Sequence, residues 1–82
     1  MAMYYAYLIK SINHPEVHYV GYTTNLKQRF ETHNSGGSIY TAKHRPWVLV
    51  MYLGFAEQAK AKEFEQYLKS QAGRAFALKR FW

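Results

Sequence analysis

Cysteine and aspartate are both missing from this sequence of 82 residues. Without cysteine the chain has neither disulfides nor a thiolate metal site, which excludes zinc fingers and fits a reducing compartment. Its N-terminal segment has no positively charged start and no apolar run long enough for a signal peptide or a membrane span. We therefore expect a cytoplasmic protein that does not contact a membrane.

Acidic side chains are few: five glutamates stand against eleven lysines and arginines, which gives a net charge of +6. Such an imbalance indicates a polyanionic partner, because neutralising phosphates releases counterions and supplies much of the affinity for nucleic acid. A basic surface that only keeps the protein soluble is the alternative. The expected nucleic-acid-binding surface includes the basic residues Lys43, Arg45, Lys69, Arg74, Lys79 and Arg80.

A chain of this length has room for one domain, residues 1–82. Short alternating or continuous apolar runs predict strands, and apolar residues spaced three or four apart predict helices. The resulting order is β-β-α-β-α-α, an α+β fold with a three-stranded antiparallel sheet flanked by helices. The expected strands are residues 4–9, 18–22 and 47–55, and the expected helices are 26–33, 57–70 and 74–80, with a loop at 35–46.

Polar residues lie on helix faces that should be buried. Arg29 and His33 share the apolar stripe of the first helix, so we place both near the core, facing the hairpin. Glu65 borders the buried face of the second helix. Gly21 interrupts the second strand, and a glycine there often marks the close approach of another backbone or a ligand. The buried stripe of the second helix is expected at Ala61, Phe64, Tyr67 and Leu68, with Gly73 as the end of that helix.

The chemistry that these residues support is phosphodiester hydrolysis. The sequence has no cysteine nucleophile, no serine in a nucleophile-elbow context and no glycine-rich phosphate loop. Arg29 suits the charge that builds on phosphate oxygens, because a guanidinium binds phosphate with two prongs and stays charged. Glu65 could hold one Mg²⁺, which commonly takes only one or two carboxylates, so the composition permits a one-metal mechanism. The ionisable residues expected near the core are Tyr7, Tyr19, Arg29, His33 and Glu65.

Four segments in this order resemble the GIY-YIG nuclease domain over nearly the whole chain. They are Tyr5-Ala6-Tyr7, Tyr19-Val20-Gly21, the arginine and histidine of TNLKQRFETHN, and the glutamate at 65 in EFEQYLKS. The resemblance is closest to the short stand-alone members and to the structure-specific endonuclease branch. The chain departs from the family at Tyr5-Ala6-Tyr7, where the motif begins Gly-Ile, and at Tyr22, where some members have lysine.

The resemblance implies a three-stranded antiparallel sheet with flanking helices and DNA cleavage that depends on one divalent ion, Mg²⁺ or Mn²⁺. It implies that Tyr19 helps to activate the attacking water, with Tyr7 beside it. Arg29 would stabilise the phosphate transition state, and Glu65 would hold the metal. By the same resemblance, His33 would transfer a proton or position a neighbour, and Gly21 would let the scissile phosphate approach the sheet.

Other interpretations of the same residues stay open. Tyr7 and Tyr19 can pack as a cross-strand aromatic pair, and Arg29 and Glu65 can form a structural ion pair. The domain can be a nucleic-acid-binding module without catalysis, or a nuclease subunit that depends on a protein partner. An endonuclease of this size would select its substrate by the structure of the DNA, through a protein partner or as a homodimer. The expected targets are single-stranded or branched DNA in repair or processing.

Overall fold

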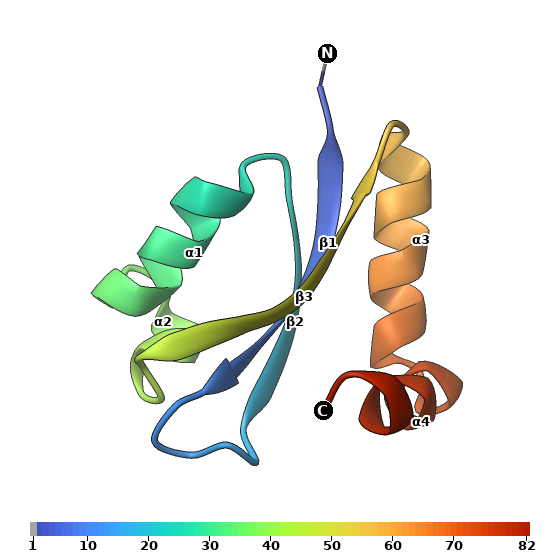
Figure 1. Ribbon diagram of the computed structural model, residues 1–82. Coiled ribbons are helices and arrows are strands. Elements are labelled where there is room, and N and C mark those ends of the chain that lie inside the picture. The colour runs from blue at the N-terminus through green and yellow to red at the C-terminus, as the bar shows by residue number, and fades with distance from the viewer. Residues whose placement is uncertain (1) are drawn as a thin grey trace.

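Hairpin pairing and helix packing give the chain the arrangement shown in Figure 1, a computed structural model that describes residues 2–82. β1 lies in the centre of a three-stranded sheet, with the antiparallel neighbours β2 and β3 on its two sides. The α+β fold with a three-stranded antiparallel sheet and flanking helices is therefore confirmed. The elements are β1 (Tyr4–Ser11), β2 (His18–Thr23), α1 (Leu26–Ser35), α2 (Ile39–Ala42), β3 (Trp47–Phe55), α3 (Gln58–Lys69) and α4 (Gln71–Arg80).

Helices cover both faces of the sheet, and β1 supplies residues to both cores. Tyr7 and Ile9 pack with Trp47 on the face that α1 covers. Leu8 packs with Leu68 and Ala77 on the face that α3 and α4 cover. Figure 1 shows α1 and α2 on one side of the sheet and α3 and α4 on the other. This arrangement follows from the alternation of side chains along a strand, and it buries β1 on both faces.

Helix α1 begins at Leu26, as the sequence predicts, and ends at Ser35, two residues later than expected. The Asn25 side chain accepts a hydrogen bond from the backbone N–H of Gln28, which is the usual N-cap geometry. Gly36 follows the helix with a φ of 83°, a left-handed conformation that favours glycine. Because both ends are fixed by local chemistry, the position of His33 on the helix is fixed as well.

The loop expected at residues 35–46 contains a short helix, α2, so the expected element order missed one helix. Its Thr41 is buried, with 1% of its surface exposed. The indole N–H of Trp47 donates to the backbone carbonyl of Thr41 at 2.9 Å and holds α2 against the sheet. Four residues are too few to show helical periodicity, which is why sequence pattern does not find α2.

The expectation that Gly73 ends the helix before it is wrong. Ser70 separates α3 from α4, and its hydroxyl accepts a hydrogen bond from the backbone N–H of Gly73 as an N-cap. A Cβ at Gly73 would lie 1.7 Å from the carbonyl oxygen of Tyr67, so glycine is needed because α4 packs directly on the end of α3. Tyr67 is 41% exposed, which corrects its expected place in the buried stripe.

Across residues 2–82, none of the helices combines the length and the apolar character that crossing a membrane requires.

Candidate active site

Tyr7 lies directly opposite Gly21 in the pairing of β1 with β2. A Cβ at Gly21 would lie 2.3 Å from both Cζ and the phenol oxygen of Tyr7. The phenol ring therefore occupies the space that any larger residue at this position would need. This packing explains a glycine inside the strand, and the approach of a phosphate to Gly21 stays a prediction.

A buried hydrogen-bond chain links three elements of the fold. The Tyr7 phenol oxygen lies 2.7 Å from Nε2 of His33, and Nδ1 of His33 lies 2.7 Å from Oγ1 of Thr41. His33 has no exposed surface, and Tyr7 is 1% exposed. Burial raises the pKa of Tyr7 above its usual range and lowers that of His33. The phenol therefore keeps its proton and the imidazole is neutral near pH 7.

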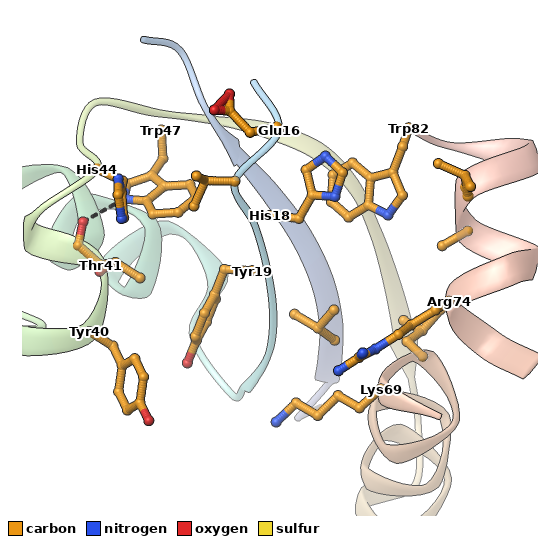
Figure 2. Close-up of a pocket in the computed structure, with 15 residues that line it drawn as sticks. Glu16, His18, Tyr19, Tyr40, Thr41, His44, Trp47, Lys69, Arg74 and Trp82 are labelled. Carbon is orange, nitrogen blue, oxygen red and sulfur yellow. Dashed lines mark hydrogen bonds between the residues drawn. The ribbon is translucent and has the colours of Figure 1, made fainter. Parts of the chain in front are cut away.

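Tyr19 packs edge-on against the imidazole of His33, with ring centroids 5.1 Å apart. Its ring centroid lies 6.4 Å from that of Tyr7, so the two tyrosines do pack as the cross-strand neighbours that the sequence allowed. Unlike Tyr7, Tyr19 is only half-buried and lines an open groove (Figure 2). The two phenols thus differ in access: one is enclosed and the other faces solvent.

Arg29 is exposed, which corrects its expected place near the core. It nevertheless lies one turn before His33 on α1, and its positive charge acts on the buried pair. The guanidinium lowers the pKa of Tyr7, against the larger opposing effects of burial and of Tyr19, and it adds to the effect of burial in lowering the pKa of His33. An exposed cation beside a buried phenol can bind an anion from solvent and stabilise negative charge nearby.

Glu65 comes from α3 and is buried, with 7% of its surface exposed. Its Oε2 lies 2.5 Å from Nζ of Lys69, and its Oε1 accepts a hydrogen bond from the Gln66 side chain at 3.1 Å. Its negative charge raises the pKa of Tyr7, as a smaller effect than burial. Within residues 2–82 the ion-pair partner of Glu65 is Lys69, and no pair with Arg29 is found.

Glu65 is the buried carboxylate that could hold a hydrated hard cation. Residues 2–82 hold no group of three or more histidine, aspartate or glutamate side chains that could bind a metal ion together. Mg²⁺ is commonly bound through one or two carboxylates while it keeps several waters, and Glu65 supplies one such oxygen pair. Lys69 competes for the same carboxylate, but its side chain is 48% exposed and is free to turn toward solvent.

A groove of about 990 Å³ crosses the edge strand β2 and joins the two helical sides of the molecule. Figure 2 shows Tyr19, Tyr40 and Thr41 on one side of β2, and Lys69, Arg74 and Trp82 on the other. The Trp82 ring stacks on His18 with a centroid distance of 3.7 Å and a tilt of 7°. The lining thus combines cations with aromatic rings, as surfaces that bind nucleic acid commonly do.

Only two of the six basic residues expected to bind nucleic acid line this groove, namely Lys69 and Arg74. The guanidinium of Arg45 lies against Gly36 at the end of α1, close enough that a Cβ there would overlap it. Arg80 lies over the Phe76 ring at 5.9 Å. A role in nucleic-acid binding for the four residues outside the groove stays a prediction; they are Lys43, Arg45, Lys79 and Arg80, and all are exposed.

The structure adds residues to the site that the sequence did not single out. Thr41 falls in a segment expected to be a loop, where no periodicity marks it. His18 and Trp82 lie 64 positions apart and meet only because α4 returns the chain to β2. Tyr40 is 86% exposed at the rim of the groove. Nothing in the sequence distinguishes it from the other tyrosines of the chain.

A three-stranded antiparallel sheet between helices, with a buried hydrogen-bonded tyrosine and histidine and a half-buried tyrosine packed against them, makes this a small α+β domain. The model of the GIY-YIG catalytic domain matches residues 3–79, and the chain belongs to the GIY-YIG family.

Similar proteins fall into two groups. A UPF0213 protein of Staphylococcus haemolyticus is 39% identical over 71 residues, which are 85% of this chain and 84% of that protein. The structure-specific endonuclease subunit SLX1 of Candida dubliniensis is 36% identical over 75 residues, which are 83% of this chain but 26% of that protein. The solution NMR structure of a UPF0213 protein from Bacillus halodurans superposes with a TM-score of 0.56 at 28% identity, and the match covers 94% of this chain and 83% of that one.

Proposed function

We propose that this protein is a DNA endonuclease that hydrolyses phosphodiester bonds with one divalent ion, Mg²⁺ or Mn²⁺, held by Glu65. The observation that carries the proposal is the electrostatic grouping of side chains from separate elements around Tyr7. Arg29 of α1 and Glu65 of α3 both act on its pKa, and His33 is hydrogen-bonded to it. Sequence similarity to structure-specific endonuclease subunits supports the same conclusion.

Tyr7 and Tyr19 differ in their access to solvent, and we assign them different roles for that reason. Tyr19 faces the groove, so its hydroxyl is the one that meets the attacking water. Tyr7, enclosed behind it, does not contact the substrate, and it orders the site through His33. The neutral imidazole of His33 can pass or accept a proton at Nε2.

Arg29 and Lys69 are the cations that bind the negatively charged phosphates of the DNA. Arg29 is exposed and always charged, so it binds the scissile phosphate and stabilises the charge that develops in the transition state. The bound ion would add a second positive charge and lower the pKa of a coordinated water. If Glu65 held that ion, its ion pair with Lys69 would be weakened, and Lys69, which lines the groove, could contact the DNA backbone.

The groove favours DNA with exposed bases, single-stranded or branched, as encountered in DNA repair and processing. Arg74 and Lys69 supply charge for the backbone, and the exposed ring of Tyr40 is available for stacking on an unpaired base. The test is to incubate the purified protein with single-stranded, duplex, flap and branched DNA, with Mg²⁺, with Mn²⁺ and with EDTA. Cleavage that requires the metal supports the proposal, and no cleavage of any of these substrates contradicts it.

A second candidate is a nuclease subunit that needs a protein partner, or a second copy of the chain, to select or cleave its target. The SLX1 relatives are named as subunits, and this chain spans about a quarter of the one from Candida dubliniensis. A protein that binds branched DNA but cleaves nothing by itself would favour this candidate, or a nucleic-acid-binding module without catalysis.

A further inference from the structure

Two aromatic side chains that are distant in the sequence stack on each other in the groove beside β2. The imidazole of His18 on β2 and the indole of Trp82, which follows α4, lie nearly parallel, with centroids 3.7 Å apart and a tilt of 7°. Trp82 is half-buried and packs against the core cluster that contains Leu68 and Ala77. His18 is exposed, so the free face of this stack is the face of the imidazole that points away from Trp82.

The sheet fixes His18 in this position and the surroundings keep its ring uncharged. β2 pairs His18 with Lys10 of β1 in antiparallel register, so the backbone below the imidazole is held by the sheet. Burial, and to a smaller extent the positive charge of Lys10, lower the pKa of His18. The imidazole is therefore neutral near pH 7. The groove thus contains a planar, neutral ring with one open face.

Charged side chains are unevenly placed along the same groove. Among residues 2–82, the acid in its lining is Glu16 and the cations are Lys69 and Arg74. In Figure 2 the stacked rings of His18 and Trp82 lie between Glu16 and the two cations. A phosphate is attracted by the cations and repelled by the glutamate. A nucleotide whose phosphate binds at Lys69 or Arg74 can therefore direct its base toward the stacked rings.

This combination fits an unpaired nucleotide better than a paired one. The faces of a base inside a duplex are covered by the neighbouring bases of the stack, and exposing them requires the base to leave the stack. An unpaired base has a free face that can pack on an aromatic side chain. Such stacking tolerates any sequence, because every base has a π-face.

We propose that His18 and Trp82 form a stacking subsite for an unpaired base of DNA: the base packs on the open face of His18 and extends the stack to three rings. Lys69 and Arg74 bind the adjacent phosphates. The subsite makes the groove prefer single-stranded or branched DNA without selecting its sequence. The inference rests on the proposed function for its choice of DNA as the partner, but it does not require that the DNA is cleaved.

The direct test is NMR of the His18 imidazole during titration with a single-stranded oligonucleotide, with EDTA present to prevent metal-dependent cleavage. We expect the ring protons of His18 to shift upfield, because a stacked base places them in its ring current. A blunt duplex of the same sequence should leave them unchanged. A single strand that does not bind, or that binds without this shift, overturns the proposal, and so does an equal shift with the duplex. Upfield shifts in a protein that cleaves no DNA would contradict the nuclease activity alone.

His18→Phe and His18→Ala form a matched pair of variants for binding measurements at about pH 7.5, again in EDTA. Phenylalanine keeps a flat ring, so we expect affinity for the single strand within about twofold of wild type. Alanine removes the ring, so we expect affinity about tenfold weaker, within the range for one stacked base. Neither change removes a charge, so the slope of log K against log salt should stay the same for both variants.

The duplex separates a stacking role from a merely structural one. We expect both variants to bind the duplex within about twofold of wild type. An alanine variant that binds the single strand as tightly as the wild type contradicts the proposal, as does an equal loss for both kinds of DNA or a phenylalanine variant as weak as the alanine variant. If the alanine variant does not fold, the NMR titration and the phenylalanine variant still decide it.

Discussion

The phenol oxygen of Tyr7 lies 2.7 Å from Nε2 of His33, a hydrogen bond between residues 26 positions apart in the chain. This contact joins the central strand β1 to helix α1 at the point where Arg29 also acts on both groups. It therefore links the packing of one core to the chemistry of the candidate site. A change at either residue should affect stability and activity together.

Replacing Tyr7 by Phe removes the oxygen and leaves a buried nitrogen of His33 without its partner. We expect the free energy of unfolding to fall by about 1 to 3 kcal/mol, measured by urea denaturation. DNA cleavage, measured where the variant is folded, should fall by at least about tenfold. The same replacement at half-buried Tyr4, for which no side-chain hydrogen bond is found within residues 2–82, is the control and should change both values little. Equal stability of the wild type and the Tyr7 variant would show that this hydrogen bond does not contribute.

Replacing Gly21 by Ala places a methyl group where the Tyr7 ring lies. Because β-strand backbone leaves little room to move, we expect a loss of about 1 to 3 kcal/mol from overpacking, with the Tyr7 ring displaced from His33. Gly37→Ala is a suitable control, since the new Cβ would meet a methyl group of Thr32 at 3.0 Å on an exposed segment. If Gly21→Ala were as stable as Gly37→Ala, the packing of the phenol over Gly21 would be refuted.

Acid should destabilise the protein through His33. Burial, and next the charge of Arg29, lower its pKa in the folded state below the usual value of 6.5. The unfolded chain then binds the proton more readily, so stability is complete above about pH 6.5 and falls as the pH drops below it. Tyr7, Tyr19 and Thr41 are the neutral groups that contact the ring.

Urea denaturation between about pH 7.5 and 5.5 tests this dependence. His33→Gln should show a smaller loss of stability on acidification than the wild type. His18, whose pKa is also lowered by burial, contributes with the same sign, so both proteins should carry His18→Gln. Identical pH profiles of the two proteins would show that His33 does not carry the effect.

Arg74 should matter more for DNA binding than Lys79. Both are exposed on α4, but Arg74 lines the groove and Lys79 does not. We expect Arg74→Gln to weaken binding and to reduce the slope of log K against log salt by about 1, whereas Lys79→Gln changes binding less. Fluorescence anisotropy at several salt concentrations measures both quantities. A larger effect at Lys79 would place the DNA outside the groove.

The sequence pattern was sufficient to predict the sheet and the longer helices, because the alternation of apolar residues and the helix caps are local features. Tyr7 and Ile9 fall on one face by alternation alone, and Asn25 identifies the start of α1 from its own side chain. The resemblance to the GIY-YIG family then brought distant residues into one predicted site. Neither source of information depends on how the helices pack against each other.

The features of the fold and the site that the sequence did not predict depend on tertiary contacts. Gly73 looks like a helix stop, yet it is required where α4 meets the carbonyl of Tyr67. Thr41 becomes part of the site only because Trp47 anchors α2 beneath His33. Arg29 is exposed although it lies on the apolar stripe of α1. Such contacts join residues from elements that no local pattern relates.

The central claim is that Glu65 holds the metal ion of a DNA-cleaving site, and Glu65→Gln tests it most directly. Glutamine keeps the shape and removes the charge, while Glu63→Gln, on the exposed face of the same helix, is the matched control. Cleavage of a substrate that the wild type cuts, with Mg²⁺ or Mn²⁺, is measured together with DNA binding. We expect Glu65→Gln to lose at least about 100-fold in cleavage rate with DNA binding retained, and Glu63→Gln to cleave normally. Metal-dependent cleavage by Glu65→Gln at the wild-type rate would contradict the claim.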